Sequence, residues 1–228
     1  MKNLAIIPAR GGSKRIPRKN IKDFLGKPII AYSIQAAIDS KLFDEVMVST
    51  DDAEIAEIAI QFGAKIPFMR SEKNSDDHAT TSEVLIEVLE QYQLNNTHFD
   101  YACCIYPTAP LINPIKIREA LEVMHGKDFD SVFPVTSFSY PILRSLKITN
   151  AKVEMNWPDY LNTRSQDLPP AFHDAGQFYW INVERFIQTK NILNDNCGSI
   201  VLSDLEVQDI DNETDWKLAE LKYSLLYK

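Results

Sequence analysis

The segment IIPARGGSKRIPRKN, residues 6–20, joins an apolar run to a basic stretch that contains two adjacent glycines. Within it, five lysines and arginines fall in the ten positions 10–19, and no acidic residue lies between them. In an α/β protein, a glycine-containing loop after the first strand places backbone N–H groups and cationic side chains at the carboxyl edge of the sheet. The segment therefore predicts a site for a small polyanion in an α/β fold.

The charge of the whole chain excludes one class of polyanion. The formal net charge is −8 at pH 7, so the basic loop stands in an otherwise acidic protein. Binding to a nucleic-acid backbone needs a spread basic face that neutralises many phosphates. We therefore expect no nucleic-acid partner, and a small ligand that carries a few phosphates fits better.

Length and composition favour one large domain. The 228 residues are 45% hydrophobic, which suffices for a substantial core. No apolar run approaches the roughly 18 residues of a membrane span, and charge comes too early at the N-terminus for a signal peptide. We expect a cytoplasmic protein without a membrane partner, whose three cysteines, Cys103, Cys104 and Cys197, are reduced.

Apolar runs of strand length alternate with amphipathic segments of helix length through the first 136 residues. This alternation predicts an α/β fold with right-handed crossovers and a mostly parallel sheet that is covered on both faces. Local signals mark helix starts: a proline at residue 28, a cap at Asp51, and the pair Thr80 and Glu83. The expected strands are residues 4–8, 45–49, 65–68, 101–106, 131–135, 178–183, 199–202 and 206–209, and the expected helices are residues 28–40, 51–63, 80–94, 114–126 and 213–226.

The alternation stops after residue 136. Residues 137–173 are rich in proline, asparagine and aspartate, and within them residues 146–149 and 152–155 predict a β-hairpin. We interpret residues 137–173 as a lobe inserted into a single domain that spans residues 1–228.

The basic loop matches neither of two common phosphate-binding motifs. The string GxxxxGK[ST] of a P-loop is absent, and no third glycine follows at the spacing of a dinucleotide fingerprint. From its composition alone, the loop is either a phosphate site or an exposed basic turn.

Six strings occur in order along the chain: IPARGGSKRIPRKN, GKPIIAYSI, VSTDD, YPTAPL, DAGQFYW and a late DID. Together they resemble the signatures of the CMP-sialic acid synthetases, a family of sugar-activating cytidylyltransferases, over essentially the whole chain. The resemblance implies a three-layer, nucleotide-diphospho-sugar transferase-like (Rossmann-like) fold. It also implies a Mg²⁺-dependent enzyme that transfers CMP from CTP to the anomeric hydroxyl of a nonulosonic acid, a nine-carbon acidic sugar, and releases diphosphate. In this family the inserted lobe makes a homodimer and reaches the neighbouring protomer's site.

The resemblance assigns nucleotide contacts to the loop by position. Arg10 and Lys19 would offset charge on the phosphates and on the transition state, so both are candidate catalytic residues. A direct contact and a solvated turn remain alternatives for the other three basic residues, Lys14, Arg15 and Arg18. The implied nucleotide contacts in the loop are Ala9, Arg10, Gly11, Gly12, Ser13, Lys19 and Asn20.

Two further residues match nucleotide contacts of the family outside the loop. Arg70 would help to enclose the nucleotide, and Ser82 would approach its ribose or base. As an alternative, Ser82 only satisfies the start of its helix together with Thr80 and Thr81.

Asp209 and Asp211 form an Asp-Ile-Asp string at the end of an expected strand, and period-two alternation sends both carboxylates to one face. Proteins often bind Mg²⁺ through one or two carboxylates together with substrate phosphates. The family's metal-binding aspartates occupy this motif, so both residues are candidate metal ligands and catalytic residues. The alternative is strand-end solvation with capping of the next helix, which has Asp215 in its first turn.

The sugar contacts are expected in two strings. YPTAPL follows a strand that is expected to be buried, which places Tyr106 and Thr108 at the ligand crevice. The commoner sialic acid synthetases carry glutamine at the position of Tyr106, and its replacement argues for a different nine-carbon acid. In DAGQFYW, residues 174–180, Gln177 and Tyr179 are expected on one face, either as sugar contacts or as a half-buried sheet face.

Two arginines of the lobe match cationic positions of the family. Arg164 matches an arginine that can address the substrate carboxylate. Arg144 is a looser match to a lysine near the sugar, and Lys147 is its rival. The string DAGQFYW resembles members that act on pseudaminic acid, which is the expected sugar. N-acetylneuraminic and legionaminic acid are alternatives, and a CTP-binding regulatory module without catalysis or a structural protein are alternatives of a different class.

Overall fold

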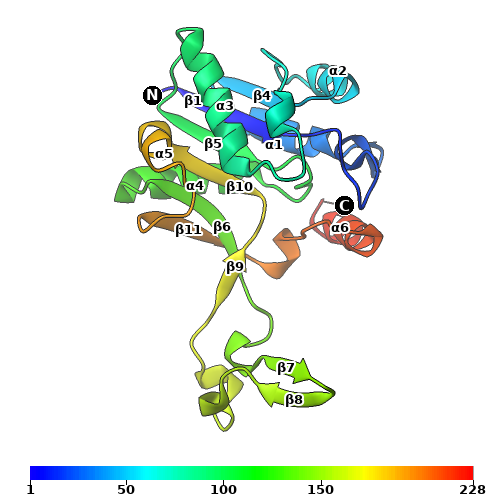
Figure 1. The fold of residues 1–228 in the computed structure, drawn as a ribbon, viewed down its shortest axis with the longest axis vertical. Coiled ribbons are helices and arrows are strands. Elements are labelled where there is room, and N and C mark those ends of the chain that lie inside the picture. The colour runs from blue at the N-terminus through cyan, green and yellow to red at the C-terminus, as the bar shows by residue number, and fades with distance from the viewer. Residues whose placement is uncertain (228) are drawn as a thin grey trace.

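The computed structural model describes residues 1–227. A central sheet is covered by helices on both faces, and a lobe projects from one end of this three-layer body (Figure 1). Both termini of the described chain lie in the three-layer body and not in the lobe.

Within residues 1–227, the central sheet has seven strands in the order β11-β6-β10-β5-β1-β4, with β9 paired to β6. Strands β4, β1 and β5 pair in parallel, as do β6 and β11, whereas β10 runs antiparallel between β5 and β6. The predicted mostly parallel sheet is therefore confirmed. The strands are β1 (Asn3–Pro8), β4 (Glu45–Ser49), β5 (Tyr101–Ile105), β6 (Ser131–Ser137), β9 (Phe172–Asp174), β10 (Phe178–Asn182) and β11 (Cys197–Leu202).

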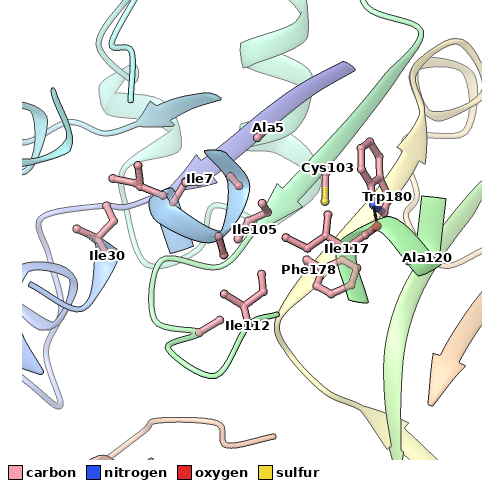
Figure 2. Close-up of a cluster of buried hydrophobic side chains, with 14 of the residues drawn as sticks. Ala5, Ile7, Ile30, Cys103, Ile105, Ile112, Ile117, Ala120, Phe178 and Trp180 are labelled. Carbon is pink, nitrogen blue, oxygen red and sulfur yellow. Dashed lines mark hydrogen bonds between the residues drawn. The ribbon is translucent and has the colours of Figure 1, made fainter. Parts of the chain in front are cut away.

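Helices cover both faces of this sheet. Ile7, Ile105 and Trp180 belong to one cluster, in which buried residues of α1, α2 and α4 pack against the sheet (Figure 2). Neighbouring strand residues belong to a second cluster with α3 and α5, because successive side chains of a strand point to opposite faces. The helices are α1 (Ile30–Ser40), α2 (Ala53–Gln61), α3 (Thr81–Leu94), α4 (Pro114–Lys127), α5 (Val183–Thr189) and α6 (Glu213–Tyr227).

A third apolar cluster anchors the two segments that matter most for the site. Ile16 of the basic loop and Ile210 of the Asp-Ile-Asp string are both 1% exposed, and both belong to a cluster with Phe24 and Trp216. Burying an isoleucine side chain stabilises a fold by about 1.5–3 kcal/mol. Because the two isoleucines share one cluster, α6 holds the basic loop and the Asp-Ile-Asp string side by side.

The lobe extends from the pairing of β6 with β9 (Figure 1). Toward its far end, β7 (Leu146–Thr149) and β8 (Lys152–Met155) pair as an antiparallel hairpin, as predicted. Asn150 and Ala151, between these strands, have φ values of 50° and 61°. Positive φ at both central residues is the geometry of a type I′ turn, whose twist matches that of the flanking strands.

Two predicted helix starts are wrong by one or two residues. The first helix begins at Ile30, because β3 (Lys27–Pro28) instead pairs with β2 (Asp23–Phe24). The cap of α2 is Asp52 and not Asp51: the Asp52 carboxylate accepts a hydrogen bond from the N–H of Ile55 at 3.1 Å. Asp51 has another role, in the basic loop.

Two predicted strands are absent from the described chain. Residues 65–68 contribute only a bridge between Lys65 and Met47, since Pro67 has no N–H to continue a ladder. Residue 206 ends a short 3-10 helix, η6 (Asp204–Glu206), and residues 207–209 follow it without regular structure; Ser203 and Glu206 form the capping box of η6. The capping box turns the chain away from the sheet, so the Asp-Ile-Asp string is not at the end of a strand.

Cys103 and Cys104 are buried in β5, and all three cysteines are free, as predicted. Burial raises the pKa of Cys104 to about 12, which keeps its thiol protonated and unreactive. Within residues 1–227, none of the helices combines the length and apolar character that a membrane crossing requires.

Candidate functional site

The basic loop leaves the carboxyl end of β1 and is held tightly by its own backbone. Ala9 is fully buried, and its N–H donates to the carbonyl of Ser49 at 2.9 Å. The Asn20 amide donates to the carbonyl of Arg10, also at 2.9 Å, and so closes the loop. These contacts give Ala9 and Asn20 a role in the shape of the loop.

The two glycines of the loop differ in what surrounds them. The N–H of Gly11 donates to the carboxylate of Asp51 at 3.0 Å, and a Cβ atom at Gly11 would lie 2.7 Å from the carboxylate of Asp52. Gly12 has open space where its side chain would be. Gly11 is thus required for contact with the string VSTDD, and Gly12 is the glycine that leaves room for a ligand.

Each cationic side chain of the loop has a partner within the chain. Arg10 contacts Asp77 at 3.0 Å and donates to the carbonyl of Asp76 at 2.6 Å, and Lys14 contacts the same Asp77 carboxylate. Arg15 contacts Asp211 at 2.7 Å. The loop is therefore not an exposed, unpaired basic turn, and most of its charge is balanced by acids from distant segments.

Arg18 faces away from this group. Its guanidinium pairs with Asp52 and Glu54 at the start of α2, and it holds the pKa of the Asp52 carboxyl below its usual range. Arg18 has a φ of 55°, which is uncommon for a residue other than glycine. Through these contacts, Arg18 links the basic loop to the start of α2.

Lys19 connects the loop to the Asp-Ile-Asp string. Its ammonium group donates to the carbonyl of Ile210 at 2.7 Å. Burial lowers the pKa of Lys19, and the nearby carboxylates of Asp211 and Asp209 act in the opposite direction. A partly desolvated ammonium group beside two carboxylates is suited to serve as the counter-ion of a bound phosphate.

These residues surround a cavity of about 260 Å³, here called the loop cavity. Four of its side chains are basic and one is acidic, so the cavity favours an anion. Of the predicted nucleotide contacts, three line it. The loop cavity is lined by Arg10, Ser13, Lys14, Arg15, Ile16, Lys19 and Asp77.

Arg70 and Ser82 lie outside the loop cavity. Arg70 is 8% exposed, and its guanidinium donates to the hydroxyl and the carbonyl of Ser49 at the end of β4. Burial lowers the pKa of Arg70. Ser82 is half-buried in the first turn of α3, where Thr80 and Glu83 make the capping box. The helix start is thus satisfied without the Ser82 hydroxyl.

The Asp-Ile-Asp string presents its two carboxylates without a strand. Ile210 is buried against α6, while Asp209 is exposed and Asp211 half-buried. The start of α6 is capped by other residues: Asn212 accepts the N–H of Thr214, and Asp215 accepts the N–H groups of Asp211 and Asn212. The capping alternative is therefore unnecessary for Asp209 and Asp211.

The donor set of this string fits Mg²⁺. Among residues 1–227, no group of three or more His, Cys, Asp or Glu side chains converges as a complete metal cage. Asp211 pairs with Arg15 of the anion-favouring loop cavity, and the string offers a second carboxylate two positions earlier, at Asp209. That is the donor set expected where substrate phosphates and water complete the coordination of Mg²⁺.

A second cavity, of about 660 Å³, lies next to Asp209 and is here called the large cavity. Asp209 lies on its wall, while Asp211 contacts Arg15 of the loop cavity. The Asp-Ile-Asp string therefore has one carboxylate at each cavity. The large cavity is lined by Thr136, Ser139, His173, Asp174, Ala175, Gly176, Asp204, Val207, Gln208, Asp209 and Lys222.

The predicted sugar contacts Tyr106 and Tyr179 pack against each other, and neither lines the large cavity. Their ring centroids are 5.3 Å apart, and the Tyr179 hydroxyl donates to Asp174 at 2.7 Å. Gln177 is buried just before β10, and its amide donates to the carbonyl of Glu206. Thr108 is half-buried in the turn after β5. Gln177 and Tyr179 therefore donate to different segments of the chain, Gln177 to Glu206 and Tyr179 to Asp174.

Arg144 and Arg164 are placed on the lobe and not at either cavity. Arg164 is exposed and forms a two-pronged ion pair with Asp167, at 2.7 and 3.2 Å. Arg144 is exposed at the end of η3 (Ile142–Arg144), and its rival Lys147 contacts Glu154 at 3.4 Å. Within one protomer, the structure does not bring these cations to the site.

Sequence reasoning missed four residues that the fold brings to the cavities. Asp77 comes from the segment before α3, and Asp174 is the first residue of the string DAGQFYW. Lys222 comes from α6, and Asp51 bonds to the loop. Asp51 and Asp174 lie in strings that were singled out, whereas Asp77 and Lys222 carry no local signal.

Comparisons with known proteins identify the family of the chain. The family model described as "Cytidylyltransferase" matches residues 4–191. The chain is 44% identical to the pseudaminic acid cytidylyltransferase of Campylobacter jejuni subsp. jejuni serotype O:2, over 99% of this chain and 97% of that protein. It is 33% identical to the CMP-N,N'-diacetyllegionaminic acid synthase of Legionella pneumophila subsp. pneumophila, over 96% of this chain and 95% of that protein.

Among solved structures, the chain resembles CMP:2-keto-3-deoxy-manno-octonic acid synthetase in complex with CTP. The TM-score is 0.71 at 18% identity, and the match covers 99% of this chain and all of that one. A 4-diphosphocytidyl-2C-methyl-D-erythritol synthase from Anaerococcus prevotii matches with a TM-score of 0.65 at 12% identity, over 98% of each chain. These two likenesses confirm the nucleotidyltransferase fold. With a family model that covers most of its length and a relative 44% identical from end to end, the chain belongs to the cytidylyltransferase family.

Proposed function

We propose that the protein transfers CMP from CTP to the anomeric hydroxyl of a nonulosonic acid in a Mg²⁺-dependent reaction, and that the sugar is pseudaminic acid. The observation that carries the proposal is the position of Lys19. This half-buried cation lines the loop cavity and bonds to Ile210, between Asp209 and Asp211. One side chain thus joins an anion-favouring cavity to a pair of candidate metal-binding carboxylates.

The residues around Lys19 suit the following reaction. The hydroxyl oxygen of the sugar attacks the α-phosphorus of CTP, and a new O–P bond forms as the hydroxyl proton is released to water. The bond to the bridging oxygen breaks, so that diphosphate leaves with the electron pair. Arg10 and Lys19 offset the charge that accumulates on the phosphate oxygens. Asp209 and Asp211 would hold Mg²⁺, which when bound neutralises phosphate charge. Arg15, which lines the loop cavity and pairs with Asp211, would add to the positive charge around the phosphates.

Two comparisons support pseudaminic acid as the sugar. The pseudaminic acid cytidylyltransferase of C. jejuni is 44% identical to the chain, and the legionaminic acid enzyme of L. pneumophila is 33% identical. Tyr106, where the commoner sialic acid synthetases carry glutamine, packs against Tyr179. The replacement of that glutamine argues for a different nine-carbon acid.

We further propose that the protein acts as a homodimer in which the lobe of one protomer serves the site of the other. Apolar side chains are exposed on the lobe, including Tyr140 at 86%, Ile148 at 74% and Leu161 at 60%. Burial of such residues against a second copy would favour association. Arg164 lies on the same lobe and away from both cavities of its own protomer, as expected of a cation that acts on the neighbouring site.

The experiment is diphosphate release from CTP and Mg²⁺ with pseudaminic, N-acetylneuraminic and legionaminic acid in parallel. We expect turnover of pseudaminic acid, with loss of turnover on removal of the metal by a chelator and in the double variant Asp209→Ala/Asp211→Ala. Asp128→Ala is the matched control, because Asp128 is an exposed aspartate that pairs with Arg185 outside both cavities.

The outcomes separate the alternatives. Preference for another of the three acids would keep the reaction and exclude pseudaminic acid as the substrate. CTP binding without diphosphate release from any sugar would instead favour a regulatory CTP-binding module. Turnover that survives in the double variant would remove Asp209 and Asp211 from the proposal.

A further inference from the structure

Asp174 is the best-positioned acceptor on the wall of the large cavity. It ends β9, and its carboxylate is held by two hydrogen bonds from its own chain. One oxygen accepts the N–H of Gly176 at 2.8 Å, and the other accepts the hydroxyl of Tyr179 at 2.7 Å. A carboxylate oxygen can accept two hydrogen bonds, so each oxygen keeps acceptor capacity for a ligand.

Tyr179, the donor of the second hydrogen bond, is held in place by the packing of its ring. It is 5% exposed, and its ring packs against Phe133 at 5.7 Å and against Tyr106 at 5.3 Å. The Tyr106 hydroxyl in turn lies 3.3 Å from the hydroxyl of Thr81, at the start of α3. Burial raises the pKa of Tyr179, so its hydroxyl stays protonated and remains a donor.

This arrangement changes the role expected of Tyr179. The residues that line the large cavity include Asp174 but not Tyr179, whose hydroxyl proton is already directed to Asp174. The sequence motif DAGQFYW therefore carries one residue that faces the cavity and, five positions later, the residue that holds it in place. Gly176 has a φ of 63°, which lets the chain turn so that both contacts reach the same carboxylate.

We propose that Asp174 contacts the sugar directly and selects for hydrogen-bond donors on it, meaning hydroxyl or amide N–H groups, and that Tyr179 is its positioning residue. The inference rests on the proposed function and names a specificity-determining residue of the same site. Because the carboxylate of Asp174 repels the carboxylate of an acidic sugar, it also turns the acid end of the substrate away from this wall.

The test compares three variants with wild type: Asp174→Asn, Tyr179→Phe and the two combined. Asp174→Asn keeps the shape but replaces an acceptor-only group by an amide, and we expect the KM for the sugar to rise about tenfold to a hundredfold. Tyr179→Phe leaves the carboxylate in place but unheld, and we expect a rise of about three- to tenfold. The combined variant should be no worse than Asp174→Asn alone, since Tyr179 acts through Asp174.

Tyr92→Phe is the matched control. Tyr92 is another buried tyrosine of the same apolar cluster, and its hydroxyl also donates to a carboxylate, that of Glu45. Both tyrosine variants are expected to lower thermal stability to a similar degree. Only Tyr179→Phe should raise the KM for the sugar, and neither should change the affinity for CTP measured by calorimetry without sugar.

Sugar binding measured by calorimetry extends the test to conditions without turnover. An unchanged sugar affinity and an unchanged KM in folded Asp174→Asn would overturn the inference while leaving the proposed function intact. An effect in the combined variant equal to the product of the two single effects would remove Tyr179 as the positioning residue. Wild-type protein that neither binds nor turns over any of the three acids would refute the proposed function, and the role of Asp174 with it.

Discussion

The loop cavity and the large cavity both involve the Asp-Ile-Asp string, since Asp209 lines the large cavity and Asp211 pairs with Arg15 of the loop cavity, but they are assembled differently. The loop cavity takes all but one of its lining residues from residues 10–19, with Asp77 as the exception. The large cavity takes its walls from four segments, which contain Ser139, Asp174, Asp209 and Lys222. A cavity built from one segment can be recognised in the sequence, whereas a cavity built from four segments cannot.

The two cavities also differ in charge. The loop cavity has four basic side chains and one acid, all from one chain. The large cavity has three aspartates, with Lys222 as its lysine, although its proposed substrate is an acid. Two protons of the Lys222 ammonium are already donated to the carbonyls of Asp204 and Val207. If the loop cavity binds the nucleotide and the large cavity the sugar, as proposed, the nucleotide side has cations of its own, whereas the sugar side needs cations from elsewhere.

The largest expected effect tests the nucleotide side. Lys19→Ala removes the cation between the loop cavity and the Asp-Ile-Asp string, and we expect the rate of diphosphate release to fall about a hundredfold to a thousandfold. The measurement is turnover at saturating CTP, with Lys65→Ala as the control, since Lys65 is an exposed lysine paired with Glu45. A loss below about tenfold would mean that Lys19 only supports the loop.

The second prediction tests whether the sugar side is completed by a partner. We expect Arg164→Ala to lower turnover about tenfold to a hundredfold, because a charge-assisted contact to the substrate carboxylate is lost. Co-expression of Arg164→Ala chains with Lys19→Ala chains should then restore about a quarter of wild-type activity. With random pairing, about half of the dimers contain one chain of each variant. Each of these mixed dimers has one site in which both Lys19 and Arg164 are intact. No recovery in the purified mixed dimer would place Arg164 in its own protomer's site.

The third prediction uses the pKa of Lys19. Burial lowers this pKa from the ordinary lysine value of 10.5, so the ammonium loses its proton below that pH. We expect CTP affinity to fall as the pH rises through this window, by up to about tenfold per pH unit for one proton. Without CTP, the free energy of unfolding should instead rise with pH over the same window, because the cost of burying the charged Lys19 disappears as this side chain deprotonates.

Calorimetric titration of CTP at several alkaline pH values measures this effect. Lys19→Arg keeps its charge throughout the range, so the affinity of that variant should stay level. An equal fall in both proteins would assign the pH dependence to another group.

The smallest expected effect concerns the one acid of the loop cavity. Asp77 pairs with Arg10 and Lys14, and these contacts hold the pKa of its carboxyl below the usual range. CTP must compete with this carboxylate, so Asp77→Asn should tighten CTP binding about two- to fivefold, as expected for exposed ion pairs. Asp128→Asn controls for the change in net charge, and weaker CTP binding in Asp77→Asn would mean that Asp77 instead helps to bind the nucleotide.

Much of the fold was predictable because its signals are local. The alternation of strands and helices predicted the mostly parallel sheet, and Asn150 and Ala151 formed the turn of the predicted hairpin. The predicted strand at residues 206–209 is wrong because the capping box of Ser203 and Glu206 is stronger than a short apolar pattern. The position of Asp209 and Asp211 is instead decided by Ile210, which is buried against α6.

The sequence by itself determined the basic loop, the motif order and the cytidylyltransferase family, because each of these is carried by residues that are neighbours in the chain. Only the tertiary structure decided that Asp77 pairs with Arg10, that Tyr179 serves Asp174, and that Arg164 is remote from its own site. The physical reason is distance along the chain. Hydrogen bonds and ion pairs between remote segments form only after the core has packed, and no local pattern encodes which partners will meet.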